Sequence, residues 1–157
     1  MTAEGGGPRW RVVTVAGIRL ELPSEHPEVV LQESEAPGRQ LRIPVGMAEG
    51  RALAYALRAI PTPRPLTHEL LVDLLDRHGV DVSALRITGR SGTTYLAELD
   101  TIGPRGQHTV PCRPSDGLCL VLRRRMATPV LVAESLLEPG APPPEPGAPP
   151  GPVPEGT

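Results

Sequence analysis

The order of its hydrophobic periodicities is the feature of this sequence that most limits the fold. Alternating apolar residues, typical of strands, occur over 10–22, 29–32, 40–45, 82–88, 93–101, 107–111 and 129–132. Helical spacing occurs over 48–60, from Thr67 to Gly79, and from Pro114 to Arg125. Strands and helices are therefore interspersed, and the pattern predicts a single α/β (α+β) domain. We expect a mixed, mostly antiparallel sheet and about three helices.

Turn residues connect the predicted strands. Pro37-Gly38 and Arg90-Ser91-Gly92 each separate two strands and predict hairpins, while Gly17 predicts a bend in the first strand. A short helical turn is expected over 134–137, after the last strand.

Cap residues indicate where the helices begin and end, and apolar stripes indicate which faces are buried. Thr67 is expected to cap the second helix and Gly79 to end it. The leucines expected to face inward on that helix are Leu70, Leu71, Leu74 and Leu75. The third helix is apolar on nearly all sides, which predicts that it is buried.

Proline sets the limits of the domain. The chain has 157 residues and 21 prolines, of which 9 fall in 139–157 together with four glycines. Such a segment cannot bury enough apolar area to offset its loss of conformational entropy. We therefore expect a flexible N-terminus over 1–8, a folded domain over 9–138 and a disordered Pro-rich tail over 139–157.

Charge and hydropathy indicate the compartment. All 16 basic residues are arginine, which suggests a GC-rich bacterial gene, and 18 acidic residues leave a net charge of −2. With so little net charge, a nucleic-acid partner would need a local basic patch. No apolar run approaches the ~18 residues of a membrane span, and the start does not resemble a signal peptide. We expect a cytoplasmic protein that does not enter a membrane.

The two cysteines are expected to be free thiols. Cys112 and Cys119 lie on either side of the predicted start of the third helix. A zinc site formed by these two residues and His108 would lack the closely paired ligands of structural zinc sites.

The first polar cluster, Arg64 to Glu69, lies at the start of the second helix. An imidazole beside a carboxylate at a helix start can transfer a proton, and a helix start favours phosphate. The structural alternative is that Thr67 caps the helix, Glu69 complements its dipole and His68 makes one structural hydrogen bond.

The second polar cluster, Arg113-Pro114-Ser115-Asp116, lies at the start of the third helix. Its guanidinium suits a phosphate oxygen, and Asp116 could hold a hydrated Mg²⁺ or Mn²⁺. The alternative is a helix start with an internal pair between Arg113 and Asp116.

Other polar residues are less specific. Glu69, Asp73 and Asp76 form an acidic stripe that could bind a metal but is more typical of a solvated helix face. Arg123 to Arg125 could contact a nucleic-acid backbone or only complement a helix dipole. Trp10, Tyr55 and Tyr95 are the only aromatic residues, so recognition of the backbone rather than of base sequence is expected.

Four motifs in order resemble the bifunctional nuclease domain family. They are Ile43-Pro44-Val45-Gly46 leading to Glu49, the stretch Arg64-Pro65-Leu66-Thr67-His68-Glu69-Leu70-Leu71, the stretch Arg113-Pro114-Ser115-Asp116-Gly117, and Pro129-Val130. The resemblance extends through most of residues 10–138. It implies a single α/β domain, an assembly of identical subunits, and cleavage of both DNA and RNA.

The resemblance also implies roles for individual residues. Catalytic roles fall on His68, Glu69, Asp116 and Glu49, and substrate contacts on Arg64, Thr67, Arg113 and Ser115. In our mechanistic hypothesis the two helix starts converge. The arginines then hold the phosphodiester, His68 transfers a proton, and Glu69 and Asp116 bind Mg²⁺ or Mn²⁺.

One departure from the family pattern keeps a second function open. Pro111 stands where the family usually has an acidic residue two places before the arginine of its third motif. The chain could therefore be a catalytically degenerate, oligomeric binding or regulatory module of the same fold.

Overall fold

The structure of the protein is a computed structural model that describes residues 7–20, 23, 25–124 and 126–139. Its strands are β1 (Trp10–Arg19), β2 (Glu28–Glu33), β3 (Gln40–Pro44), β4 (Asp81–Ser91), β5 (Thr94–Gly103), β6 (Gly106–Cys112) and β7 (Val130–Ala133). Its helices are α1 (Met47–Leu57), α2 (Thr67–Arg77) and α3 (Pro114–Arg123), followed by the 3₁₀ turn η1 (Glu134–Leu136). The predicted flexibility of 1–8 and disorder of 139–157 fall almost wholly outside the described residues.

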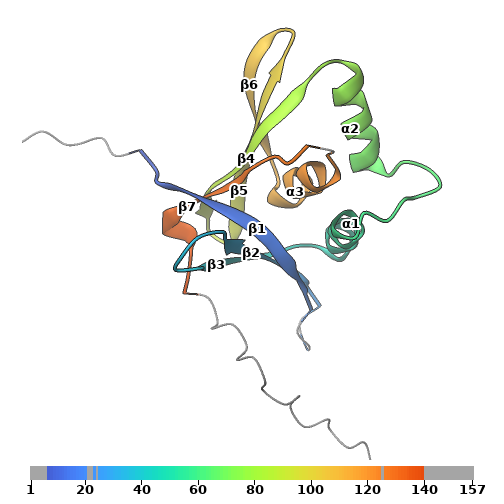
Figure 1. Ribbon diagram of the computed structural model, residues 1–157. Helices are drawn as coiled ribbons and strands as arrows, with labels where there is room; N and C mark the ends of the chain where they lie inside the picture. The colour runs from blue at the N-terminus through green and yellow to red at the C-terminus, as the bar shows by residue number, and fades with distance from the viewer. Residues whose placement is uncertain (1–6, 21–22, 24, 125, 140–157) are drawn as a thin grey trace, which may run out of the picture.

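The strands of the described chain form one sheet in the order β3-β2-β1-β7-β4-β5-β6 (Figure 1). Strand β7 pairs parallel with β4, and the other described pairings are antiparallel. The predicted α+β domain with a mixed, mostly antiparallel sheet and three helices is confirmed. Because β7 lies between β1 and β4, it joins an N-terminal group of strands to the group β4-β5-β6.

The turns predicted from glycine and proline are present. Strands β2 and β3 form a hairpin around Gly38, which has a φ of +75°, and β4 and β5 form a second around Gly92, with a φ of +61°. Positive φ values favour glycine, which has no Cβ to clash with the backbone. The pairing of β1 with β2 shifts register between Val15 and Gly17, so β1 is irregular at the predicted bend.

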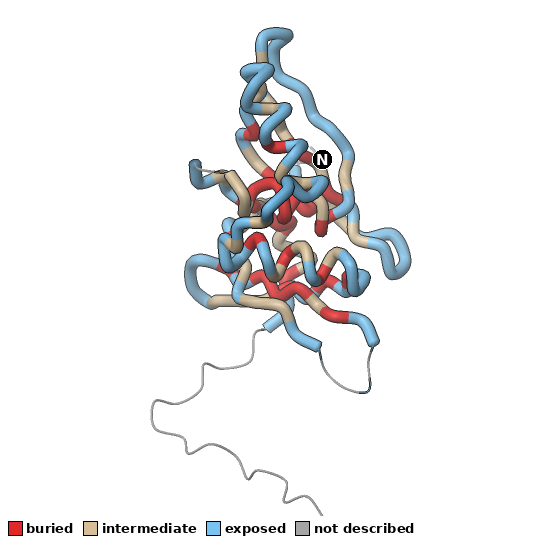
Figure 2. Tube along the Cα trace, turned by 90° about the vertical axis from the view of Figure 1, so that its right-hand side faces the viewer, coloured by how far each residue is buried: buried red, intermediate tan, exposed pale blue. Residues whose placement is uncertain are grey.

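Helix α3 is the central helix of the domain. It packs on β4 and β5, while α1 and α2 each pack against α3 on the same side of the sheet (Figure 1). Leu118 and Cys119 of α3 are buried with Leu85 and Ile87 of β4 in one core cluster. Figure 2 shows that buried residues gather inside the molecule. The prediction of a buried third helix is confirmed. Its central position fixes where its first turn lies.

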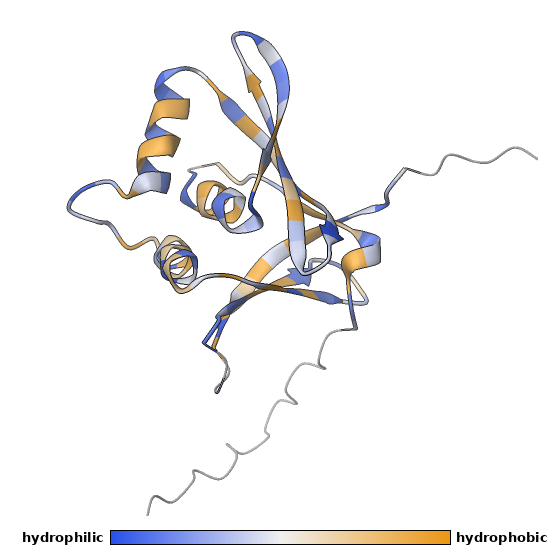
Figure 3. Cartoon of the chain, turned by 180° about the vertical axis from the view of Figure 1, so that it is seen from behind, coloured by the Kyte–Doolittle hydropathy of each residue, from blue (hydrophilic) through white to orange (hydrophobic). Residues whose placement is uncertain are grey.

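Helix α2 differs from the expectation in two ways. Leu70, Leu71 and Leu74 are 52%, 40% and 45% exposed, so the prediction that they face inward is wrong for these three. Only one side of α2 rests on α3, and that side presents Val72 and Leu75, while much of the helix stands away from the sheet (Figure 3). The cap is Leu66 and Thr67 is the first helical residue, so Thr67 does not cap the helix.

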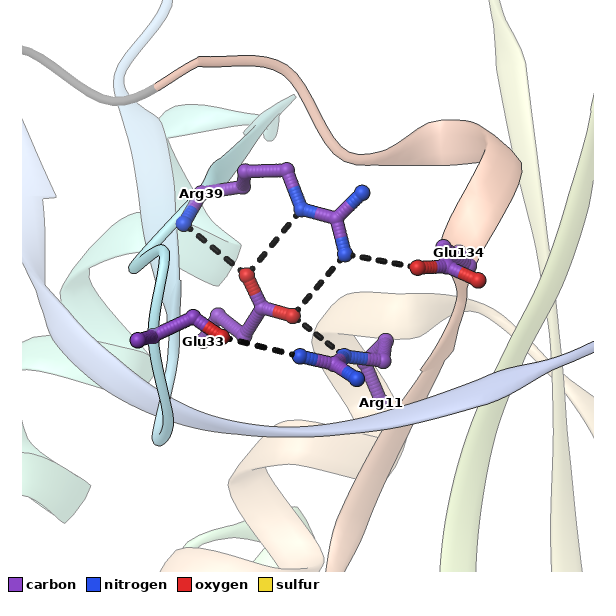
Figure 4. A network of polar contacts seen from close by, with 5 residues as sticks. Arg11, Glu33, Arg39 and Glu134 are labelled. Carbon is purple, nitrogen blue, oxygen red and sulfur yellow. Dashed lines mark hydrogen bonds and ion pairs between the residues drawn. The ribbon is translucent and has the colours of Figure 1, made fainter.

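A buried carboxylate, that of Glu33, joins β1 to the β2–β3 hairpin. Glu33 has a side chain that is 1% exposed, and it accepts hydrogen bonds from Arg11 and from the backbone N–H and guanidinium of Arg39 (Figure 4). The Arg39 Nη2 also donates to Glu134 of η1 at 2.9 Å. Hydrogen bonding to Arg39, opposed by burial, lowers the pKa of Glu33 to about 2. The network thereby joins β1, β2 and η1 through ionised groups.

None of the described helices has the length and apolar character needed to cross a bilayer.

Acid should weaken the domain through Glu33. The pKa of Glu33 is depressed in the folded state. Its contribution to the free energy of unfolding is therefore fully present above the ordinary pKa of 4.5 and is lost as the pH falls toward 2. We expect Glu33→Gln to cost about 3 kcal/mol at neutral pH, the low end for a broken buried ion pair, because the arginines keep access to solvent. Urea unfolding across this pH range, with the exposed Glu35→Gln as control, should show a smaller pH slope in Glu33→Gln; an unchanged slope contradicts the assignment.

Gly50 allows α1 to approach the loop before β2. A Cβ at Gly50 would lie 2.7 Å from Cγ and 3.3 Å from Cβ of Pro27, whose ring cannot rotate away. Overpacking costs about 1–3 kcal/mol and exceeds the helix propensity of up to about 1 kcal/mol that alanine gains. Gly50→Ala should therefore lower the free energy of unfolding in urea. Gly89→Ala, where the new Cβ meets nothing within 4 Å, is the matched control; equal stability of the two variants would refute the steric argument.

Candidate functional site

Each helix carries an acidic residue at the third position of its first turn. These residues are Glu49 in α1, Glu69 in α2 and Asp116 in α3, which follow the cap residues Gly46, Leu66 and Arg113. A carboxylate in this position is stabilised by the free N–H groups and the dipole at the helix start. The three carboxylates share one sequence position but have different partners.

Side chains from three helix starts are joined through Arg113 and Asp116. Arg113 Nε and Nη2 donate to Asp116 Oδ2 and Oδ1 at 2.7 and 3.1 Å, and Arg113 Nη1 donates to Glu49 Oε1 at 3.1 Å. His68 Nε2 lies 3.0 Å from Asp116 Oδ1, although the two residues are 48 positions apart in the chain. We call Glu49, His68, Arg113 and Asp116 the helix-start network. The predicted convergence of the two helix starts is confirmed.

Asp116 is the central acceptor of this network. Its side chain is 30% exposed and accepts from Arg113 and, when Nε2 carries the proton, from His68. Hydrogen bonding from Arg113, with a smaller contribution from His68 and against the effect of burial, lowers the pKa of Asp116. Asp116 is therefore an ionised acceptor at neutral pH, able to orient both the guanidinium and the imidazole.

Arg113 is both ordered and accessible. Its side chain is 65% exposed, and three of the five N–H groups of a guanidinium are used in bonds to Asp116 and Glu49. The remaining N–H groups are free to donate to an anion at the surface. Glu49 folds back over Gly46, where an added Cβ would collide with its carboxylate. The absence of a side chain at position 46 thus lets Glu49 reach Arg113.

Charge limits what this network can bind without help. Two carboxylates and one guanidinium give a net charge of −1 while His68 is neutral. A phosphate would be attracted to the exposed face of Arg113 but repelled by the carboxylates behind it. Protonation of His68 or an added cation would offset that repulsion.

Glu69 has separate partners. It accepts from Thr62 Oγ1 at 2.7 Å and from the backbone N–H of Leu66 at 3.0 Å, and it forms an ion pair with Arg123. Burial raises the pKa of Glu69, but the bonds from Thr62 and Leu66 and the ion pair with Arg123 together outweigh it and lower the pKa. The contact with Leu66 is the glutamate half of a capping box, which leucine cannot reciprocate because it has no side-chain acceptor. The contacts of Glu69 are those of a helix cap and of an ion pair that joins α2 to α3.

The remaining predicted substrate residues lie around the network in different environments. Arg64 and Thr67 are exposed at the entry to α2, and no partner of the Arg64 side chain is found among the described residues. Ser115 is 6% exposed within the first turn of α3. Of the eight predicted site residues, direct side-chain contacts join Glu49, His68, Arg113 and Asp116.

The described residues do not fit a metal site made of protein ligands alone. In the parts of the chain that the structure describes, no three His, Cys, Asp or Glu side chains gather as a metal site. Glu69 and Asp116, the two predicted ligands, bond to different arginines. Metal binding by these two residues stays a prediction.

The cysteines match their expected state. Cys112 and Cys119 are free thiols, and burial raises the pKa of each to about 11. Thiols with such a pKa carry little thiolate at neutral pH, so neither is suited to be a nucleophile there.

A pocket beside the network was missed by sequence reasoning. It has a volume of about 270 Å³ and lies between β3, the starts of α1 and α3, and the β4–β5 hairpin. Its lining residues are Ile43, Pro44, Val45, Gly46, Glu49, Thr93, Thr94, Tyr95, Arg113, Pro114 and Ser115. Thr93 and Thr94 gave no signal beyond the start of the strand predicted over 93–101, and no local pattern indicates that this strand lies beside α3.

Sequence comparison with known proteins shows the family to which the chain belongs. The sequence profile of the bifunctional nuclease domain matches residues 29–143, which include the whole helix-start network. An uncharacterized protein of Mycobacterium tuberculosis strain H37Rv is 36% identical over 125 residues, covering 80% of this chain and 73% of that protein.

Two plant proteins are more distant relatives. Bifunctional nuclease 2 of Arabidopsis thaliana is 27% identical over 110 residues, covering 68% of this chain and 33% of that protein. Bifunctional nuclease 2 of Oryza sativa subsp. japonica is 27% identical over 124 residues, covering 76% of this chain and 37% of that protein. The chain thus spans about a third of each plant relative. Since the profile covers well over half of its length, this chain belongs to the bifunctional nuclease domain family.

Proposed function

We propose that the protein is a nuclease that hydrolyses phosphodiester bonds of DNA and RNA without strong sequence preference. The observation that carries the proposal is the contact of His68 with Asp116, 3.0 Å long, beside the accessible guanidinium of Arg113. A proton-transfer group and an anion-binding group on adjacent helix starts are the parts that phosphodiester hydrolysis needs. Family membership and the plant relatives' name support the same reaction.

In this proposal His68 is the general base. When Asp116 accepts the proton of Nε2, the other ring nitrogen, Nδ1, carries a lone pair that can take a proton from water or from a ribose hydroxyl. Asp116 fixes the tautomer and stabilises the imidazolium that forms, which is the role of the carboxylate behind a catalytic histidine. Proton transfer to the leaving oxygen then restores the neutral ring.

Arg113 would hold the phosphate. Its free N–H groups can donate to a non-bridging oxygen, and the bonds to Glu49 and Asp116 keep its plane fixed while charge develops on that oxygen. Arg64 and Thr67, exposed at the start of α2, add contacts to neighbouring phosphates. Such contacts position a strand without reading its bases, which accounts for a tolerance of sequence.

The net charge of −1 gives a reason to test Mg²⁺ and Mn²⁺. Mg²⁺ often keeps several waters and binds through one or two carboxylates together with substrate phosphates. We propose that activity depends on such an ion, and we assign no step of the reaction to it.

A second candidate function is a catalytically degenerate binding or regulatory module. The observation in its favour is that Glu49 and Asp116 already neutralise Arg113 and use three of its N–H groups, which weakens its attraction for a phosphate. Both candidates would act in the cytoplasm as assemblies of identical subunits. The exposed leucines of α2, Leu66, Leu70, Leu71 and Leu74, offer apolar area for such an assembly.

The test of the proposed function is cleavage of fluorescently labelled single-stranded DNA and RNA. We expect cleavage by the wild-type protein, a loss of at least about 100-fold in His68→Ala, which removes the general base, and a similar loss in Asp116→Asn. Chelator should abolish activity and Mg²⁺ or Mn²⁺ should restore it. The exposed His78→Ala serves as control. Wild-type activity in both site variants would show that cleavage occurs elsewhere, and a folded but inactive wild type would favour the binding module.

Glu69→Gln should affect stability more than chemistry. It keeps an acceptor for Thr62 and Leu66 but breaks the ion pair with Arg123, whose Nη2 is already buried without a hydrogen-bond partner. We expect a loss of about 1–3 kcal/mol in urea unfolding and less than a tenfold change in cleavage per folded molecule. A large loss of cleavage at unchanged stability would instead return Glu69 to the catalytic residues.

A further inference from the structure

The pocket of about 270 Å³ beside Arg113 has the chemistry of a site for a neutral ring. We propose that it receives the base of one unstacked nucleotide whose phosphate is held by Arg113, so that the preferred substrate is single-stranded or locally unpaired. This inference rests on the proposed function, because it places the substrate strand at Arg113. It adds a substrate class that the helix-start network does not determine.

The floor of the pocket is apolar and pre-formed. Ile43 and Val45 are 3% and 9% exposed, and Pro114 is also buried, so these side chains do not have to be ordered when a ligand binds. Tyr95 packs partly against the core, and the guanidinium of Arg90 lies 5.9 Å from its ring centroid. An aromatic ring held in this way offers a rigid surface for a planar ligand.

The rim supplies hydroxyl groups with free hydrogen-bonding capacity. Ser115 is 6% exposed, and neither it nor Thr93 or Thr94 has a side-chain hydrogen bond to any described residue. These hydroxyls can therefore bond to a ligand without giving up a bond to a described residue. Because a hydroxyl both donates and accepts, such a rim can bind the edge of any base. This agrees with weak sequence preference.

Charge and size favour a base over a second phosphate. The pocket is lined by one cation, Arg113, and one anion, Glu49, which are paired with each other at 3.1 Å. A second phosphate would face Glu49 without a cation of its own, whereas a base brings no charge. The volume lies just below the roughly 300–1,000 Å³ of pockets for drug-sized ligands, so it suits one ring system. A base stacked within a duplex has to leave the stack to enter it.

The experiment compares binding of three short nucleic acids in the His68→Ala background, where the strand is not consumed. They are a labelled single strand, the same backbone with every base replaced by an abasic spacer, and the matching duplex. Fluorescence anisotropy should show that the intact single strand binds about tenfold more tightly than either of the others, as stacking of one base predicts. Equal affinity for the intact and abasic strands, or for the single strand and duplex, would overturn the proposal.

A substitution that fills the pocket tests whether the preference for strands with bases arises there. Thr94 is exposed at the start of β5, so Thr94→Trp should fold normally and occupy the pocket; its melting temperature checks this. We expect Thr94→Trp to reduce the preference for the intact over the abasic single strand from about tenfold to about one, while the abasic strand binds as before. Leu96→Trp, at a 47% exposed position of the same strand outside the pocket, should keep the full preference. A preference that survives Thr94→Trp would contradict the assignment.

The outcomes separate this inference from the proposed function. Base-dependent binding with no cleavage by the wild-type protein would support the pocket and reject the nuclease. Cleavage with equal binding of intact and abasic strands would support the nuclease and reject the pocket. No binding of any strand would reject both.

Discussion

The carboxylate of Asp116 is the group on which the site depends. It is the common acceptor for Arg113 and His68, and it connects the start of α3 with the start of α2. A carboxylate at the third residue of a helix is favoured by the free N–H groups there, so its own position costs the fold little. The same residue therefore serves the local stability of α3 and the orientation of the two side chains that we propose hold and activate a phosphodiester.

Buried α3 gives that carboxylate its fixed position. Leu118 and Cys119 belong to the same buried core as Leu85 of β4, and Gly117 brings the helix so close that an added Cβ would lie 2.5 Å from Leu85 Cδ1. Movement of the first turn would disturb this packing. The rigidity that catalysis requires of Asp116 and Arg113 therefore comes from apolar contacts one turn further along the same helix.

Local patterns in the sequence were sufficient to predict most of the fold. The hairpins follow from Pro37-Gly38 and Arg90-Ser91-Gly92, and the start of α3 follows from Pro114, because proline and glycine fix backbone angles without help from distant residues. The leucines of α2 were misjudged because an amphipathic pattern identifies an apolar face but not whether anything covers it. That depends on where α2 ends up in space, which only the packing against α3 decides.

The site was predictable only where a known family supplied the residues. The motifs identified His68, Arg113 and Asp116, and the structure brings them together. They did not distinguish Glu49 from Glu69, since both are glutamates at the same helical position; the difference arises from Arg123 and Thr62, which draw Glu69 away. The lining of the pocket by Thr93, Thr94 and Tyr95 depends on the β4–β5 hairpin reaching α3, a long-range contact that carries no local signal.

The central position of β7 has a consequence for synthesis of the chain. Residues 130–133 pair with β1 on one side and with β4 on the other, so the two groups of strands are joined by the last of the described strands to be synthesised. Until then β1 and β4 each present an unpaired edge, and unpaired edges can associate with other chains. The sheet can therefore close only after β7 has been synthesised, and shortening the chain before residue 133 would leave the two groups of strands without their common strand.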